Sequence, residues 1–319
     1  MMSSTVLITG AYGRLGQAAL SEFASRGWVI HTLVRTAGKR VSATAAPNSQ
    51  IHEFVGDVCD FDAFKTAATG CDVILHAANP SYEHWSNVLP ESTQNLINVA
   101  AAVDATIVMP GNVYPYGESM PPVLRPTTPH VPSCEHGQLR ADLEASLCRA
   151  AQQQDVQTLL VRAGNYIDGR DTGNWFESYL CRDLSKGKFM YPGATDVECA
   201  WVYLPDVAKV MAQVAELRSE LNHYEDIGIP GFSVNGLELF NAVEKVVGKP
   251  LTRTTLPWFM VKILGYVLPK MKAVYELRYL FFVPHSVDGA RLKEVLPLFE
   301  STSIEETLSL VFEKPTRAG

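Results

Sequence analysis

The sequence lacks a block of positive charge, a long hydrophobic run and any closely spaced pair of cysteines. Its 319 residues carry 27 Lys and Arg against 34 Asp and Glu, which gives a formal net charge of −7. Non-specific nucleic-acid binding draws its affinity from Lys and Arg on phosphates, so this balance excludes nucleic acid as the expected partner. A membrane partner is not expected either, because there is no polybasic anchor.

The cysteines are few and scattered. None of the six forms a Cys-x-x-Cys pair, which favours reduced thiols in a cytoplasmic compartment over a disulfide framework. We expect no signal peptide, because the N-terminus enters a strand-like run at once. The most apolar late stretch, residues 256–268, is interrupted by Lys262 and is too short to span a bilayer. It predicts a buried or interfacial helix.

What the sequence does contain is an alternation of short apolar runs with helical patterns. Strands are predicted at residues 5–9, 28–34, 51–55, 73–76, 106–109, 156–162 and 201–203. Helices are predicted at residues 17–26, 61–69, 92–103 and 136–153. Such βα units predict an α/β fold of the Rossmann type, with a doubly wound parallel sheet. Residues 118–134 are rich in proline and predict a loop, whereas the chain after about residue 231 turns helical and apolar.

Three glycines lie between the first predicted strand and the first predicted helix. Gly10, Gly13 and Gly16 form a G-x-x-G-x-x-G pattern, which permits a tight turn and lets the backbone approach a pyrophosphate. The N-terminus of the helix then offers N–H groups to the phosphates. We therefore predict a dinucleotide site, with a tight turn that binds no ligand as the alternative. The intervening residues expected to contact the cofactor are Tyr12, Arg14 and Leu15.

Arg35 ends the second predicted strand, where an acidic residue would accept a hydrogen bond from the ribose 2′-hydroxyl of NAD. An arginine suits a 2′-phosphate instead, and Arg14, Lys39 and Arg40 add positive charge nearby in the sequence. NADP is therefore the expected cofactor, with NAD as the alternative. A solvated basic loop would explain the same residues without a ligand.

Two later strand ends supply further candidates for the cofactor site. Asp57 follows the third predicted strand and is placed to accept a hydrogen bond from the adenine amino group; a helix N-cap or a turn is the alternative. His76, Ala77 and Ala78 end the fourth, where small residues let the backbone approach a flat ligand. The alternative for His76 is a core histidine.

This set of motifs resembles the extended short-chain dehydrogenase/reductases of the NAD-dependent epimerase/dehydratase type. The matching pieces are residues 9–16, 56–58, 76–78, 113–117, 161–166 and 201–208, with Asn95 in a helix between them. The resemblance implies an NAD(P)-binding domain at residues 1–170, to which residues 200–230 return. It implies a substrate-binding region at residues 171–199 and 231–319, and a homodimer. It also adds Val58, Asn95, Gly164 and Asn165 to the expected cofactor contacts.

The catalytic positions depart from the family pattern of a Ser followed by a Tyr-x-x-x-Lys pair. Asn112 stands where the Ser is expected, His136 where the Tyr is expected and Arg140 where the Lys is expected. Histidine titrates near neutrality and can act as a general acid or base. Arg140 can hydrogen-bond a ribose or phosphate but cannot lose its proton. Asn112 can donate to a carbonyl oxygen, and Tyr114 and Tyr166 are further candidate proton donors.

These replacements leave two functions open. The first is an NADP(H)-dependent oxidoreductase or epimerase-like enzyme acting on a small carbonyl or secondary alcohol. The second is a catalytically inactive NADP(H)-binding sensor.

Other residue clusters have weaker functional interpretations. We expect no metal site, because the Pro-rich loop has no paired ligand spacing; its candidate ligands are His130, Cys134, Glu135 and His136. Aromatic residues that line a pocket or else belong to the core are Trp175, Phe176, Tyr191, Trp201 and Tyr203. Arginines available for a substrate diphosphate are Arg162, Arg170 and Arg182. The apolar segments 258–268 and 275–282 close a pocket, form a dimer face or are simply buried.

Overall fold

A computed structural model describes residues 4–37, 50–169 and 174–312. The chain divides into two compact units. The first unit consists of Met1–Gly111, Gln138–Arg162 and Val207–Ile227, and the second of Asn112–Gly137, Ala163–Asp206 and Gly228–Gly319. Lys39, Arg40 and Arg170, three of the basic residues considered above, lie outside the described residues.

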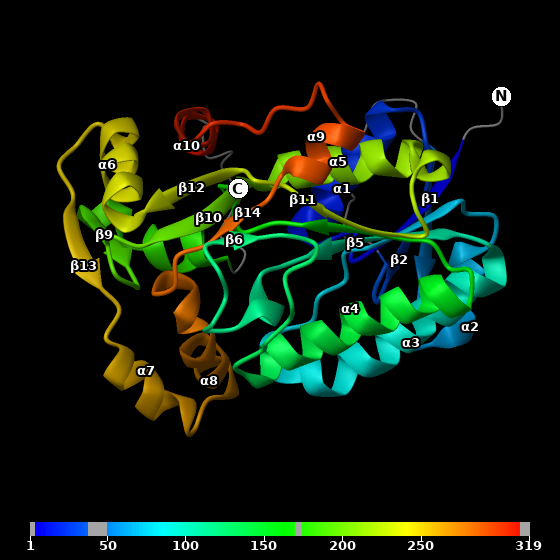
Figure 1. Cartoon of the computed structure of the whole chain (residues 1–319), viewed down its shortest axis with the longest axis horizontal. Coiled ribbons are helices and arrows are strands. Elements are labelled where there is room, and N and C mark those ends of the chain that lie inside the picture. Colours follow the sequence, from blue (N-terminus) through cyan, green and yellow to red (C-terminus); the bar gives the residue numbers. More distant parts are fainter. Residues whose placement is uncertain (1–3, 38–49, 170–173, 313–319) are drawn as a thin grey trace. The chain divides into compact units, whose positions relative to one another are not determined.

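A seven-stranded sheet forms the centre of the first unit (Figure 1). Its strand order is β11-β7-β5-β4-β1-β2-β3, and each pair whose register is described is parallel. The strands are β1 (Thr5–Thr9), β2 (Val29–Val34), β3 (Ile51–Val55), β4 (Val73–His76), β5 (Thr106–Gly111), β7 (Thr158–Arg162) and β11 (Tyr224–Gly228). The sheet confirms the predicted α/β fold of the Rossmann type.

Helices cover both faces of this sheet, and this explains why its inner strands are apolar along their whole length. Val6, Leu7 and Ile8 of β1, for example, are completely buried. In Figure 1, α1 and α5 lie on one face, and α2, α3 and α4 on the other. The bounds are α1 (Arg14–Ser25), α2 (Phe61–Ala68), α3 (Trp85–Val103), α4 (Glu135–Gln153) and α5 (Leu204–Glu216).

The strand order reverses between β1 and β4, because the chain builds outward from β1 to β3 and then returns to add β4 and β5 on the other side. In open parallel sheets, ligands bind at the carboxyl ends of the strands beside such a reversal. The loops that follow β1 and β4 begin at Gly10 and Ala77. The fold therefore brings the predicted glycine loop and the predicted small residues after His76 to one edge.

Three small sheets and five helices build the described part of the second unit. The sheets are β12-β10-β8, β13-β9 and β14-β6. Their strands are β6 (Val123–Leu124), β8 (Asn165–Ile167), β9 (Lys188–Tyr191), β10 (Glu198–Tyr203), β12 (Phe232–Asn235), β13 (Thr252–Thr255) and β14 (Ser286–Val287). The helices are α6 (Gly236–Val247), α7 (Trp258–Gly265), α8 (Pro269–Glu276), α9 (Ala290–Val295) and α10 (Ile304–Phe312). Short helical turns along the whole chain span Tyr82–His84, Tyr114–Tyr116, Phe176–Leu180, Leu184–Lys186, Arg218–Glu220 and Leu277–Phe281.

Two sequence predictions need correction. The helix predicted to begin at residue 92 begins at Trp85. It contains Pro90 beyond its first turn, where the missing N–H removes one intrahelical hydrogen bond. The region after residue 231 is not purely helical, because it also supplies β12, β13 and β14. β13 is polar and pairs with β9, far earlier in the chain, so no local apolar pattern indicates it.

Candidate functional site

The glycine loop makes the closest backbone contacts of the candidate cofactor site. Gly10 has φ +70°, a conformation that L side chains rarely adopt. A Cβ atom there would lie 2.7 Å from the carbonyl carbon of Ala77, so β1 and β4 approach too closely for any side chain. A Cβ atom on Gly16 would lie 2.2 Å from the carbonyl oxygen of Gly10. The loop is therefore shaped by its glycines, as predicted.

The N-terminus of α1 is suited to an anion. Its N-cap is Gly13, which provides no side-chain hydrogen bond, and no acidic residue lies in the first turn. The first N–H groups of a helix have no partner within the helix, and the helix dipole places partial positive charge there. Gly13 itself donates its N–H to the carbonyl oxygen of Gly10 at 2.8 Å. The N–H groups of Leu15 and Gly16 thus fit a pyrophosphate.

Tyr12 extends from the glycine loop to the edge of the sheet, where its hydroxyl donates a hydrogen bond to Glu53 on β3. Arg35 immediately follows β2 and is exposed, so its guanidinium is open to a ligand from solvent. Arg14 begins α1 and is half-buried. Both arginines belong to the first unit.

His76 occupies the core at the end of β4. Its Nδ1 lies 3.0 Å from the hydroxyl of Thr9 on the neighbouring strand. Burial lowers the pKa of His76 to about 4, with a smaller contribution from the positive charge of Arg140. The imidazole is therefore neutral at physiological pH, and its surroundings match the alternative of a core histidine.

A hydrogen-bonded turn follows β3. Asn95 of α3 donates from Nδ2 to the carbonyl oxygens of Val58, at 3.2 Å, and Cys59, at 2.9 Å. The carboxylate of Asp57 accepts the N–H of Cys59 at 2.9 Å, as in an Asx turn. The N-cap of α2 is Asp60, so Asp57 closes a turn and does not cap the helix, and its contact with the adenine amino group stays a prediction. Asn95 fixes the shape of this turn.

His136 lies in the first turn of α4 and is almost completely buried. Its Nδ1 lies 3.2 Å from Oε2 of Glu276, the last residue of α8. Lys272, one turn earlier on α8, lies 3.6 Å from the other oxygen of Glu276 and 3.4 Å from Glu135. The imidazole is thus oriented by a carboxylate that the sequence analysis did not identify.

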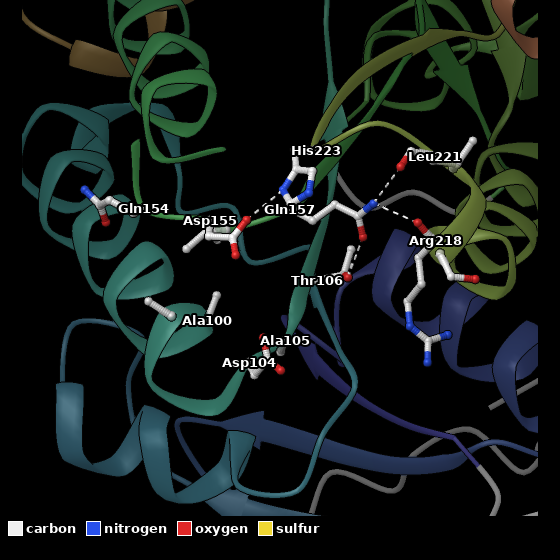
Figure 2. A pocket seen from close by; sticks show the side chains of 13 residues that line it. Ala100, Asp104, Ala105, Thr106, Gln154, Asp155, Gln157, Arg218, Leu221 and His223 are labelled. Atoms are coloured by element: carbon white, nitrogen blue, oxygen red, sulfur yellow. Dashed lines mark hydrogen bonds and ion pairs between the residues drawn. The ribbon is translucent and has the colours of Figure 1, made fainter. Parts of the chain in front are cut away.

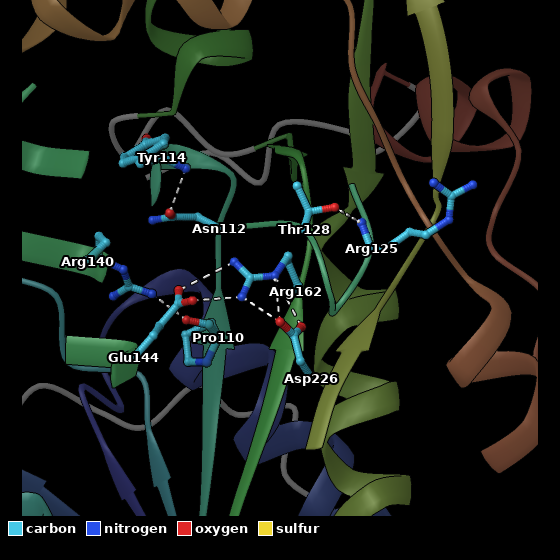
Figure 3. A network of polar contacts seen from close by, with 9 residues as sticks. All are labelled: Pro110, Asn112, Tyr114, Arg125, Thr128, Arg140, Glu144, Arg162 and Asp226. Atoms are coloured by element: carbon cyan, nitrogen blue, oxygen red, sulfur yellow. Dashed lines mark hydrogen bonds and ion pairs between the residues drawn. The ribbon is translucent and has the colours of Figure 1, made fainter. Parts of the chain in front are cut away.

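Arg140 lies one helical turn after His136 and is also buried. Its Nη2 donates to the carbonyl oxygen of Pro110 on β5 at 2.6 Å (Figure 3). This bond ties α4 to the carboxyl end of β5. One edge of the Arg140 guanidinium therefore faces the backbone of Pro110.

Asn112 and Tyr114 form a turn in the second unit. Oδ1 of Asn112 accepts the N–H of Tyr114 at 3.0 Å, and the hydroxyl of Tyr279 donates to the carbonyl oxygen of Tyr114 at 3.0 Å. Tyr116 is buried with its ring edge-on to His130. Tyr114, a candidate proton donor, is half-buried.

Three further candidates lie at the start of β8. A Cβ atom on Gly164 would lie 2.3 Å from the carbonyl oxygen of Ala200, so this glycine permits close packing against β10. Asn165 is buried, and its Nδ2 has no hydrogen-bond partner among the described residues. Tyr166 pairs with Val202 of β10 and is half-buried. The amide of Asn165 can therefore donate to a bound ligand.

Arg162 does not serve a substrate phosphate, contrary to one sequence interpretation. It is 2% exposed and is held between Glu144 of α4 and Asp226 of β11, with Nη2 2.7 Å from an oxygen of each (Figure 3). Arg182 is exposed and lies 3.6 Å from Asp183. The aromatic candidates are buried, which supports the core interpretation: Trp175, Phe176, Tyr191, Trp201 and Tyr203.

A separate cavity of about 560 Å³ lies at the amino ends of β5 and β7 (Figure 2). Gln157 occupies its wall, donating to the carbonyl oxygens of Arg218 and Leu221 and accepting from the hydroxyl of Thr106. Ligands of parallel sheets bind at the opposite, carboxyl edge, so this cavity does not belong to the dinucleotide site. Among the residues that the structure describes, no group of three or more His, Cys, Asp or Glu side chains is arranged to hold a metal ion.

Comparison with known proteins agrees with this geometry. A model of the NAD dependent epimerase/dehydratase family matches residues 6–229. A fatty acid hydroxylase, uhd1, of Mycosarcoma maydis is 31% identical over 137 residues, which cover 40% of this chain and 45% of that protein. A serine 3-dehydrogenase of Rhizobium radiobacter is 36% identical over 124 residues, covering 34% and 50%. The matched segments thus span about half the length of these two relatives.

One solved structure extends the comparison to nearly the whole fold. The L-threonine dehydrogenase of Phytophthora infestans superposes with a TM-score of 0.78 at 17% identity, covering 98% of both chains. At this identity the match concerns the fold alone.

Proposed function

The chain belongs to the NAD-dependent epimerase/dehydratase family, and we propose that it is an NADP(H)-dependent oxidoreductase or epimerase-like enzyme. Its substrate in this proposal is a small molecule with a carbonyl or secondary hydroxyl group. The observation that carries the proposal is the glycine loop. Gly10 and Gly16 leave no room for side chains beside the point where the strand order reverses between β1 and β4, which is where parallel sheets bind ligands.

The cofactor would be held by the first unit. The N–H groups of Leu15 and Gly16 would bind the pyrophosphate, and Arg35 would bind the 2′-phosphate. The turn that Asn95 fixes after β3 would lie against the adenine. When bound, the nicotinamide would supply or accept the hydride.

His136 would move the proton. In the tautomer in which Nδ1–H donates to Glu276 at 3.2 Å, Nε2 carries the lone pair and would be the atom that accepts a proton from a substrate hydroxyl group. Glu276 would be a positioning residue, since it fixes the tautomer and ring orientation of His136. Arg140 would stay protonated and anchor the helix through Pro110.

The first experiment replaces His136 with Ala and measures NADPH fluorescence on a panel of aldehydes, ketones and sugars, together with the interconversion of sugar epimers, which consumes no net NADPH. We expect turnover to fall by at least about 100-fold, because general acid–base catalysis contributes about 10²–10⁴. Cofactor binding should be unchanged. His223→Ala is the matched control, because His223 is 63% exposed and pairs with Asp155 instead. Equal turnover in the His136 variant and in this control would remove His136 from the mechanism.

The positioning role of Glu276 is tested separately with Glu276→Gln. A glutamine can still accept from Nδ1–H but carries no charge. We expect a lower kcat, an altered pH–rate profile and an unchanged KM. A change in KM alone would contradict the positioning role.

The cofactor preference is tested with Arg35→Asp, which should shift the ratio of NADP to NAD affinity toward NAD. An unchanged ratio would contradict the role of Arg35. Tight NADPH binding with neither substrate-dependent NADPH consumption nor interconversion of sugar epimers across the panel would favour the alternative function, a sensor of the NADP(H) ratio.

A further inference from the structure

The second unit exposes a cluster of large apolar side chains at one site. Thirteen large hydrophobic residues are exposed in the described part of the chain. Seven of them lie in the ten-residue stretch 259–268, which comprises most of α7 and the turn after it. The most exposed are Tyr266 at 81%, Val267 at 79% and Phe259 at 75%. The others are Met260, Ile263, Leu264 and Leu268. We call these seven residues the α7 face. Exposed apolar clusters of this kind mark interaction sites rather than ordinary surface.

Packing and hydrogen bonding on the inner side hold α7 in place. Val261, on the inner side of α7, is buried. Nε1 of Trp258 donates to the carbonyl oxygen of Pro192 at 2.5 Å, and its ring packs edge-on to Tyr275 of α8. α7 and α8 lie side by side in Figure 1. The apolar side chains are therefore presented by a packed helix, and the prediction that this segment is simply buried is wrong.

The surrounding charge is positive in a chain that is acidic as a whole. Residues 245–275 contain six Lys or Arg and no Asp or Glu; without these six, the chain would have 21 basic residues against 34 acidic ones. Lys262 and Lys270 are exposed within and just after the α7 face. Lys262 lies 5.8 Å from the ring centre of Tyr275. Lys272 is engaged by Glu135 and Glu276.

We propose that the α7 face docks on the surface of a bilayer that contains anionic phospholipids. Its apolar side chains would enter the boundary between headgroups and acyl chains, while Lys262 and Lys270 would meet the lipid phosphates. This is surface attachment: among the described residues no helix has the length and apolar content to cross a bilayer. The net charge of the whole chain conceals this local surface, which is why the sequence predicted no membrane partner.

Charge distinguishes this occupant from a second copy of the chain. In a two-fold dimer the same patch would face itself, so the positive charge of both copies would be brought to one interface. Like charges facing one another at an interface are unfavourable. An anionic lipid surface complements the charge of the same lysines. Its acyl chains would also remove the apolar side chains from contact with water.

The test is co-sedimentation of the full chain with vesicles. We expect binding to vesicles of phosphatidylcholine with phosphatidylserine, and weaker, salt-insensitive binding to phosphatidylcholine alone. The triple variant F259S/Y266S/V267S should bind at least about 1000-fold more weakly, since burying each of the three side chains contributes about tenfold or more. The variant K262Q/K270Q should lose about fivefold per lysine, and only at low salt.

Leu298→Ser is the matched control, because Leu298 is 95% exposed but lies outside the α7 face. Its vesicle binding should equal that of the unaltered chain. NADPH affinity, measured by fluorescence for every variant, reports that the fold is retained and does not depend on lipid. Absence of vesicle binding would overturn the proposal, as would equal losses in Leu298→Ser and the triple variant. A dimer that the triple variant dissociates, without lipid binding, would assign the face to a second copy instead.

Discussion

Replacing Arg162 with Met should lower the free energy of unfolding of the first unit by about 4 kcal/mol. Arg162 ends β7 and lies between Glu144, which is 1% exposed, and Asp226, which is 9% exposed. Methionine fills much of the same volume without positive charge, so the perturbation is mainly electrostatic. Figure 3 shows the guanidinium between the two carboxylates.

The magnitude follows from the contacts that are lost. Nε and Nη2 of Arg162 reach both oxygens of Asp226 at 2.7–3.1 Å, and Nη1 and Nη2 reach both oxygens of Glu144 at 2.7–3.4 Å. Removing one partner of a buried ion pair costs about 3–5 kcal/mol, because the remaining charge is left unpaired. Here two carboxylates lose the same partner. The expected loss of about 4 kcal/mol lies inside that range.

The assay is urea denaturation followed by circular dichroism and by tryptophan fluorescence, with each transition fitted separately. The matched control is Arg125→Met, because Arg125 forms a single ion pair with Asp288 and is 59% exposed. Exposed ion pairs contribute at most about 1 kcal/mol. The variant E144L/R162M/D226L should recover most of the loss, since it removes the uncompensated charges as well. The reasoning is refuted if R162M loses no more than R125M, or if the triple variant is less stable than R162M.

Three further predictions concern the loop, the core and a helix end. Gly10→Ala should destabilise the first unit by about 3 kcal/mol and abolish cofactor binding, because it combines a strained φ with a 2.7 Å clash against Ala77; an unchanged NADPH dissociation constant would contradict it. The pKa of His76 is lowered from 6.5 to about 4, so the unfolded state binds more protons between these pH values, and stability should fall by up to about 3 kcal/mol as the pH drops through that window. His76→Gln should flatten this part of a plot of melting temperature against pH, and an identical slope would be inconsistent with a buried neutral histidine. Asn235→Ala should cost about 1 kcal/mol in urea denaturation, because it removes the capping box with Glu238 at the start of α6; no loss would mean that the cap contributes nothing.

The first unit was largely predictable because its strands are buried on both faces and its glycine loop is a local pattern. β1 reads directly as an apolar run, and the loop after it follows within a few residues. A local pattern does not reveal a buried ion pair. The sequence interprets Arg162 as available to a ligand, because its partner Asp226 lies on another strand, far away in the sequence. β13 was missed because its pairing with β9 is a tertiary choice that overrides a weak local preference.

The candidate proton-transfer residue, His136, shows that a local motif does not identify the partner that a catalytic side chain needs. A tyrosine that gives up its proton becomes an anion, so the family pattern supplies a lysine cation one turn later on the same helix. A histidine that takes up a proton becomes a cation, so it needs an anion instead. In this chain the anion is Glu276, which comes from α8 and lies 3.2 Å from His136, while the cation at the lysine position, Arg140, donates to the backbone of Pro110. The replacement is therefore consistent in charge, although its two parts lie far apart in the sequence, and loss of Glu276 should impair an enzyme of this design but leave a cofactor sensor unaffected.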